Sequence, residues 1–358
     1  MGETVAIQPD VAFLRRVLAS GGGDLKKCYQ CATCSVVCEL SEDESPFPRQ
    51  QMLEAQWGLK DRLVSDPAIW LCHNCAKCTE QCPRGARPSE VLGALRAEAI
   101  RHFSFPQFLG AWAANPKALP LLFLLPLLIF SAIWLWAPKP VPAVPFEFGS
   151  QFPASVLEPL FFAVSGFALL AFAVGIARYV RALGASGGAV APGLPHTLTE
   201  IAAHRRFTKC DDPGMRLAHL LMFWGFMGLA LVGTITGIGT MAGIVHTPLR
   251  MTSALKIFAN LVALAALAGA VLLLVRRAGK AGSTYFDWFF LATLAGVVVT
   301  GIASEILRLV ETNAMYGVYF VHLVLIFSLL LYAPYSKFAH IAYRAVAMAS
   351  SRKSYAHR

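Results

Sequence analysis

Long apolar segments restrict the fold of this chain more than any other feature. The chain is 56% hydrophobic and only 15% charged, whereas a soluble globular protein carries about 25% charged residues. Six apolar stretches are each about long enough, as helices, to cross the ~30 Å hydrocarbon core of a bilayer. They cover residues 118–136, 160–180, 217–245, 254–275, 288–307 and 316–339. The sequence therefore predicts a membrane domain of about six transmembrane helices within residues 105–358.

The basic residues indicate how these helices are oriented. Arginine and lysine concentrate in the loops after the second and fourth segments and in the C-terminal tail, whereas the opposite loops offer only Lys139, Arg250, Lys256 and Arg308. By the positive-inside rule, the N- and C-termini are expected to be cytoplasmic. Residues 1–27 lack the apolar core of a secretory signal, which favours a multi-pass protein of the cytoplasmic (inner) membrane. These loops account for the net charge of +10, so binding to nucleic acid is not expected.

Eight of the nine cysteines lie in two copies of one motif near the N-terminus. The stretches "CYQCATCSVVC" and "CHNCAKCTEQCP" share the spacing C-x2-C-x2-C-x3-C, and the second ends in Cys-Pro. This is the spacing of two-cluster ferredoxins, in which the fourth cysteine of each motif binds the other [4Fe–4S] cluster. Zinc is the alternative, but zinc sites favour separate CxxC pairs. The predicted ligand sets are Cys28, Cys31, Cys34 and Cys82 for one cluster, and Cys72, Cys75, Cys78 and Cys38 for the other.

The segment between the two motifs has 33 residues, too many for a compact bacterial ferredoxin. Residues 48–64 carry apolar side chains at helical spacing, which predicts one helix. Residues 89–103 form a second predicted helix, with Ser89 as its N-cap. We therefore expect an all-α fold, in which an α-helical ferredoxin domain in residues 1–104 is fused to the membrane bundle.

Four histidines lie near the ends of the third and sixth apolar segments. His322 and His340 are 18 residues apart. On an unbroken helix this separation is about five turns, so both would lie on one face. His219 opens the third segment on the cytoplasmic side and His246 closes it on the far side. Ionisable groups at membrane depth are functional candidates, and neutral imidazole binds haem iron. The pattern indicates two b-type haems, although each histidine alone also suits an interfacial hydrogen bond.

The two predicted haem sites differ in how well their ligands can pair. His219 and His340 share the cytoplasmic side and form the predicted inner site. His246 is the predicted partner of His322 at the outer site. It lies 27 residues from His219, so on an unbroken helix the two would point in opposite directions, and the glycine-rich stretch must turn His246 inward. Met241 is the competing ligand. Lys256, at the outer end of the fourth segment, is a candidate to bind a quinone carbonyl, the alternative being a lysine that reaches the membrane surface.

Several stretches of the chain resemble known families. "FPRQ" between the cysteine motifs and "WLCHNCAKCTEQCP" resemble the iron–sulfur C subunit of heterodisulfide reductase. "RLAHLLMFWGF", "VLLLVRR" and "VHLVLIFSLLLYAPYSKFAHI" resemble the cytochrome b (gamma) subunit of respiratory nitrate reductase and the E subunit of heterodisulfide reductase. Fused in this order, the chain is similar to the C subunits of quinone-interacting membrane-bound oxidoreductases.

This resemblance implies a membrane subunit that transfers electrons between menaquinone and adenylylsulfate reductase in sulfate respiration, with soluble flavin- and iron–sulfur-containing subunits as partners. His219, His322 and His340 fall on positions that bind haem in the nitrate-reductase family, whereas the fourth position is Leu229. Two alternatives stay open. One is a heterodisulfide-reductase-like or sulfite-reductase-linked module, and the other is a membrane iron–sulfur redox sensor or maturation protein without haem.

Overall fold

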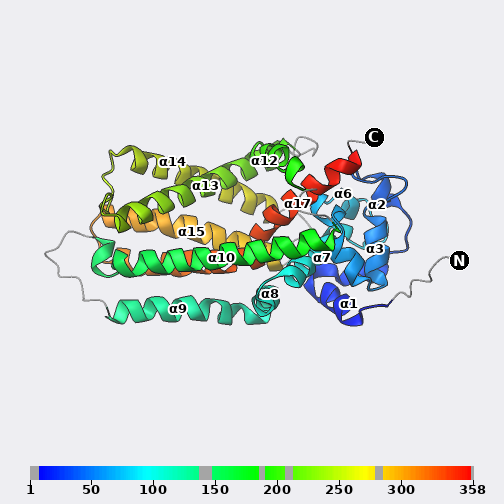
Figure 1. Ribbon diagram of the computed structural model, residues 1–358, viewed down its shortest axis with the longest axis horizontal. Helices are drawn as coiled ribbons and strands as arrows, with labels where there is room; N and C mark the ends of the chain where they lie inside the picture. The colour runs from blue at the N-terminus through cyan, green and yellow to red at the C-terminus, as the bar shows by residue number, and fades with distance from the viewer. Residues whose placement is uncertain (1–7, 137–146, 185–189, 206–212, 279–284, 356–358) are drawn as a thin grey trace.

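The computed structural model describes residues 8–136, 147–184, 190–205, 213–278 and 285–355. Every regular element in these ranges is a helix, which confirms the predicted all-α class. The cysteine-rich domain lies at one end of the molecule, and the long apolar helices run side by side away from it (Figure 1). The first described helix and the last one both lie at this end, as an even number of crossings requires.

The described part of the cysteine domain packs seven α-helices around an apolar core. They are α1 (Val11–Val17), α2 (Thr33–Val36), α3 (Arg49–Gln56), α4 (Lys60–Ser65), α5 (Ala68–Leu71), α6 (Lys77–Glu80) and α7 (Pro88–Phe103). Asp10 caps α1, because its carboxylate accepts a hydrogen bond of 2.7 Å from the Phe13 N–H. The helix α7 begins at Pro88 after Arg87, so the prediction of Ser89 as N-cap was wrong; the Ser89 hydroxyl instead lies 2.6 Å from that of Thr79.

The single helix predicted over residues 48–64 is two helices, α3 and α4. Gly58 has a φ of +68°, the left-handed conformation that ends many helices. Its N–H donates to the Ala55 carbonyl, and the next N–H, of Leu59, donates back to Glu54. The Gly58 carbonyl in turn accepts from the Asp10 N–H at 2.9 Å. The break therefore lets the N-terminal segment pack against the α3–α4 turn.

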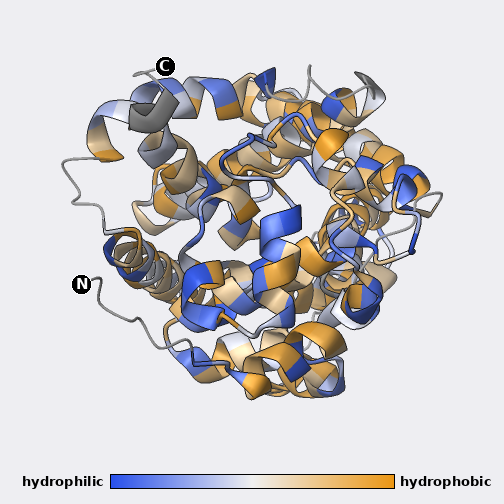
Figure 2. Ribbon diagram, turned by 90° about the vertical axis from the view of Figure 1, so that its right-hand side faces the viewer, coloured by the Kyte–Doolittle hydropathy of each residue, from blue (hydrophilic) through white to orange (hydrophobic). Residues whose placement is uncertain are grey.

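The membrane domain has six helical segments long and apolar enough to cross a bilayer, as predicted. They correspond to α9 (Leu119–Trp136), α10 (Ala154–Ala182), α13 (Pro213–Met241), α14 (Ala254–Ala278), α15 (Tyr285–Leu309) and a last segment made of α16 (Ala314–Tyr332) and α17 (Phe338–Tyr355). The short helices α8 (Gln107–Ala113) and α12 (Leu194–Ala202) lie near the cysteine domain. Seen from that end, hydrophobic residues colour much of the helical ribbon (Figure 2), and many large apolar side chains of the bundle helices are exposed, as lipid contact requires.

The last membrane segment is broken, and the prediction of one unbroken helix was wrong. The helix α16 ends at Tyr332, and a 3-10 turn over Ala333–Tyr335 contains Pro334. Proline has no N–H to donate into a helix, and Ser336 is extended, with φ −111° and ψ −169°. The five-turn register between His322 and His340 therefore does not apply, because α17 starts anew and runs into the cysteine domain (Figure 1).

One apolar core joins the two domains. Trp70 of α5, Phe103 of α7, Tyr179 of α10 and Tyr343 of α17 are all buried in the same cluster. The Trp70 and Tyr343 rings stack with centroids 5.0 Å apart, and Tyr179 meets both edge-on. The predicted boundary at residue 104 follows the end of α7, but the packing is continuous across it.

Gly175 of α10 lies where α7, α10 and α17 meet. A Cβ atom there would lie 2.6 Å from the Tyr343 hydroxyl oxygen and 3.5 Å from the Phe103 carbonyl oxygen. Tyr343 packs against three aromatic rings, so it cannot give way freely. We expect Gly175→Val to lower the free energy of unfolding by about 1–3 kcal/mol, measured as a lower thermal unfolding temperature of the full chain in detergent.

Gly166, on the same helix, is the matched control. A Cβ atom at Gly166 would have no neighbour within 4 Å, so Gly166→Val makes the same change of residue type without the clash. Equal destabilisation by both variants would mean that the close approach at Gly175 is not important.

Candidate metal centres

The two cysteine loops share one backbone conformation although their sequences differ. Gln30 and Ala32, on either side of Cys31, have φ values of 61° and 67°. Asn74 and Ala76, on either side of Cys75, have φ values of 54° and 67°. Positive φ is uncommon for residues other than glycine. Its recurrence at matching positions indicates that the common cysteine spacing sets the shape of both loops.

The first motif gathers its three leading cysteines with one cysteine of the second motif. Cys34 interacts electrostatically with Cys28, Cys31 and Cys82, and its burial raises the pKa of its thiol to about 11. The Ala86 N–H donates to the Cys82 sulfur at 3.3 Å. The structure thus brings together the four residues of the first predicted ligand set.

The second predicted set also comes together. Cys38, Cys72, Cys75 and Cys78 line one cavity, and Cys78 interacts electrostatically with the other three. Burial and the neighbouring cysteines raise the pKa of the Cys78 thiol, and a bound metal would favour loss of its proton. The Asn74 N–H donates to the Cys72 sulfur at 3.4 Å.

These arrangements suit iron–sulfur clusters. Within the described ranges, no three histidine, cysteine or acidic side chains are placed to hold a single metal ion. What the loops do offer is a cavity lined by four cysteines and N–H groups directed at sulfur atoms. Hydrogen bonds to the sulfurs are among the features that set cluster potentials. The ligand roles of the eight cysteines stay predictions that this geometry suits.

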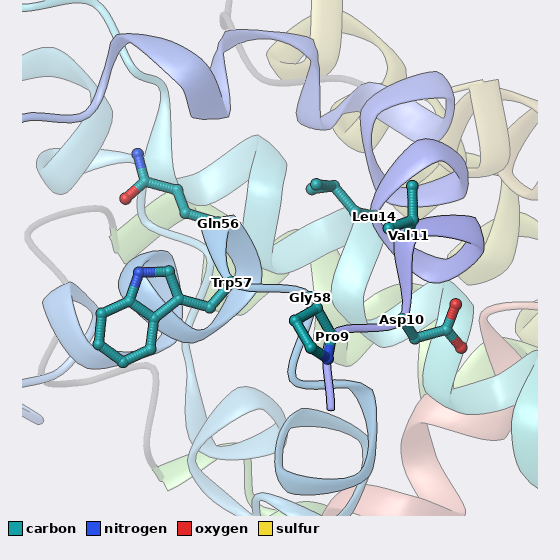
Figure 3. Close-up of a pocket in the computed structure, with 7 residues that line it drawn as sticks. All are labelled: Pro9, Asp10, Val11, Leu14, Gln56, Trp57 and Gly58. Carbon is teal, nitrogen blue, oxygen red and sulfur yellow. The ribbon is translucent and has the colours of Figure 1, made fainter. Parts of the chain in front are cut away.

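Gln56 is a supporting residue that the cysteine spacing did not reveal. Its side-chain amide donates to the Cys28 carbonyl at 3.0 Å and to the Leu25 carbonyl at 3.2 Å, so α3 holds the start of the first loop. Gln56 also lines a separate cavity with Pro9, Asp10, Val11, Leu14, Trp57 and Gly58 (Figure 3). None of the eight motif cysteines lines that cavity, so we do not assign it to the metal centres.

Trp70, just before the second cysteine loop, packs beside a histidine of the membrane domain. The His340 ring of α17 lies with its centroid 6.1 Å from that of Trp70, two residues before Cys72. Trp70 is fully buried, and its indole Nε1 has no hydrogen-bond partner among the described residues. This donor would suit a bound group that carries a hydrogen-bond acceptor.

His219 of α13 lies near His340 of α17, and their assignment to one inner haem site stays a prediction. The two side chains lie close enough to interact electrostatically. A third histidine, His204, was missed by the sequence analysis; its ring centroid lies 6.2 Å from that of His219. Burial lowers the pKa of His204. Its φ of +50° places it in a tight turn after α12, a position that helical periodicity does not predict.

His322 of α16 is partly buried and faces α15. Its Nδ1 lies 3.0 Å from the Thr300 hydroxyl, and a Cβ atom at Gly301 would lie 2.8 Å from the ring. A partner at Nδ1 fixes the orientation of an imidazole, as at many metal sites. This placement suits the predicted haem role, which stays a prediction.

The other predicted outer residues lie in different settings. The helix α13 ends at Met241, because Gly243 has a φ of +70° and the Ile244 N–H donates back to the Gly239 carbonyl. His246 follows on an exposed loop, whereas His322 is partly buried in the bundle, so pairing between them stays a prediction without structural support. Lys256 forms an ion pair of 2.9 Å with Glu305 of α15 and is therefore committed to a protein partner.

Comparison with known proteins identifies the class of the cysteine domain. Residues 24–86 match the family of 4Fe-4S dicluster domains, and all eight motif cysteines lie in this range. The domain thus has the features of an iron–sulfur electron-transfer subunit, and the predicted [4Fe–4S] chemistry is confirmed at this level. No solved structure matches the chain.

The curated relatives that match the cysteine domain are C subunits of heterodisulfide reductases. The C subunit of H(2):CoB-CoM heterodisulfide,ferredoxin reductase from Methanothermobacter thermautotrophicus is 38% identical over 92 residues, which is 26% of this chain and 50% of the relative. The C subunit of ferredoxin:CoB-CoM heterodisulfide reductase from Methanosarcina mazei is 36% identical over 88 residues, covering 25% of this chain and 54% of the relative. The chain spans about half the length of these curated relatives, and the predicted resemblance of the ferredoxin domain to the heterodisulfide reductase C subunit is confirmed.

The interleaved ligand sets can be tested with single serine variants. We expect Cys82→Ser to abolish the cluster of Cys28, Cys31 and Cys34, and Cys38→Ser to abolish the other. Each variant should retain about half of the iron, because each set holds one four-iron cluster. Iron content and electron paramagnetic resonance (EPR) spectra of the reduced chain measure this. If both variants lost the same EPR signal, the interleaved assignment would be wrong.

Proposed function

We propose that this protein is a membrane electron-transfer subunit that connects the menaquinone pool with cytoplasmic redox partners. Eight cysteines would hold two [4Fe–4S] clusters, and His219, His340 and His322 would hold b haems. Bound in these positions, the clusters and haems supply one-electron transfer. The protein contributes their spacing, burial and hydrogen bonds.

The contact of His340 with Trp70, in the helix α5 that leads into the second cysteine loop, is the observation that carries this proposal. Trp70 is two residues from Cys72 along the chain, and its ring packs beside that of His340. The metal-binding loop and the histidine at the inner membrane side are thus joined by one buried aromatic residue. A redox sensor or a maturation protein without haem has no need for this arrangement.

The outer end of the bundle is where we propose that menaquinone binds. His322 is partly buried there, and its neighbour Tyr319 packs with its ring centroid 6.2 Å away. The nearby carboxylate of Glu305 accepts hydrogen bonds from Lys256 and Arg308. The direct role proposed for Lys256 therefore requires it to leave Glu305, and Lys256 is better suited to position that carboxylate.

The partners follow from the relatives and from the resemblance of the whole chain. The heterodisulfide reductase C subunit is by name one part of a larger enzyme, which supports soluble partner subunits here. The proposal that adenylylsulfate reductase is a partner rests only on the resemblance to quinone-interacting membrane-bound oxidoreductases. A heterodisulfide-reductase-like partner is the second candidate, which the relatives of the cysteine domain favour. Mass identification of subunits that co-purify with the chain from its native membrane distinguishes the two.

Reduced-minus-oxidised absorption spectra of the purified chain test the proposal. We expect the α-bands of b-type haem, and we expect His340→Ala to remove the inner haem while both clusters survive. The clusters should survive because the His340 ring packs against Trp70 of the cysteine domain rather than against a predicted cluster ligand. Haem and iron contents per chain provide the measurement.

His196→Ala is the matched control for that variant. His196 lies on α12 with 42% of its side chain exposed, so its loss should change neither haem nor iron content. Wild-type spectra without haem bands would refute the proposal. Loss of all haem, or of none, in His340→Ala would contradict the assignment of the inner site.

A further inference from the structure

Two arginines from different domains hold the segment that leads into the second cysteine loop. Arg344 of α17 donates to the Trp70 carbonyl at 3.0 Å and to the Cys72 carbonyl at 2.9 Å, and its guanidinium lies 3.3 Å from His73 Nδ1. Arg96 of α7 donates to the Ile69 carbonyl at 3.1 Å and to the Asn74 side chain at 3.4 Å. The segment is thus fixed from the membrane domain and from its own domain.

The geometry of α17 explains why one helix can make these contacts. His340, Tyr343 and Arg344 are three and four residues apart, so they share one face of the helix. All three meet the same short stretch: His340 and Tyr343 contact the Trp70 ring, and Arg344 binds the backbone on both sides of Leu71. Both Arg344 and Arg96 also interact electrostatically with His340.

We propose that Arg344 is a positioning residue that sets the reduction potential of the second cluster and links it to the inner histidine site. This inference rests on the proposed function, because it takes the cysteines of the second set as cluster ligands. Nothing in the cysteine motifs or in the relatives of the cysteine domain assigns this role, since Arg344 belongs to the membrane domain.

The physical basis is the fixed positive charge. Reduction adds one negative charge to a cluster, so a nearby cation stabilises the reduced form and raises the potential. A planar guanidinium with several donors is held more rigidly than an ammonium group. The charge of Arg344 lies against the Cys72 carbonyl, whereas Cys28, Cys31 and Cys34 are on a different loop. Its effect should therefore be specific to one of the two clusters.

An EPR-monitored redox titration of the full-length chain tests this inference with Arg344→Gln. We expect the midpoint potential of one cluster to fall, with about a tenfold shift of its one-electron equilibrium, or ~59 mV. The potential of the other cluster should not change. These potentials can be read whether or not haem is bound, so absent haem bands would refute the proposed function without deciding this test.

Arg178→Gln is the matched control. Arg178 of α10 also links the domains, because it donates to the Phe103 and Ser104 carbonyls at 3.4 and 2.6 Å, but these acceptors lie at the end of α7 rather than in a cysteine loop. This variant should leave both potentials unchanged. The inference is overturned if Arg344→Gln leaves both potentials unchanged, shifts both equally, or acts no differently from Arg178→Gln.

Arg344→Lys provides a second test in case Arg344→Gln does not retain its clusters. Lysine keeps the charge but cannot bind three acceptors with one planar fork. We expect a shift of about threefold in the same direction and at the same cluster. In that case, unchanged potentials or equal shifts at both clusters in Arg344→Lys overturn the inference.

Discussion

The packing of α17 against the segment from Trp70 to His73 is the contact on which the rest of the arrangement depends. A soluble domain tethered to a bundle by a linker alone would move relative to it, as domains with small interfaces do. Here Trp70 is fully buried among Tyr179, Tyr343 and His340, and Arg344 pairs with the backbone beside it. Aromatic packing buries the contact, and the hydrogen bonds of Arg344 fix the orientation of the segment. The second cysteine loop is therefore held in place relative to His340.

The sequence predicted what depends on local spacing. Apolar segments of membrane length and the repeated C-x2-C-x2-C-x3-C pattern were sufficient for the six crossings and for the gathering of Cys82 with the first motif and Cys38 with the second. Both signals are strong for the same reason: a bilayer fixes the length of a helix, and a cluster fixes the distances between its ligands. Neither depends on which distant residues happen to pack nearby.

Sequence reasoning failed where tertiary contacts decide the outcome. Periodicity placed His322 and His340 on one helix face, but Pro334 and Ser336 end that helix and α17 follows a new direction. The residues that periodicity missed also depend on tertiary contacts. His204 approaches His219 through a left-handed turn, and Arg344 binds the Cys72 carbonyl from 272 residues away. Pro334 was the one readable signal, because proline within an apolar segment interrupts its hydrogen bonds.

The two cysteine loops have the same backbone conformation but different neighbours, and only the second is bound to the membrane domain at the position after its first cysteine. Tyr29 and His73 hold matching positions, each directly after the first cysteine of its motif. Tyr29 is 69% exposed, with the Arg84 guanidinium 4.2 Å from its ring centroid, whereas His73 is held by Arg344 of the membrane domain. Cys31 and Cys75 are both exposed, so the two loops differ in their tie to the membrane domain rather than in the exposure of these cysteines. If both loops hold clusters, this tie makes the second loop the one fixed relative to His340, because Arg344 and His340 lie on the same face of α17.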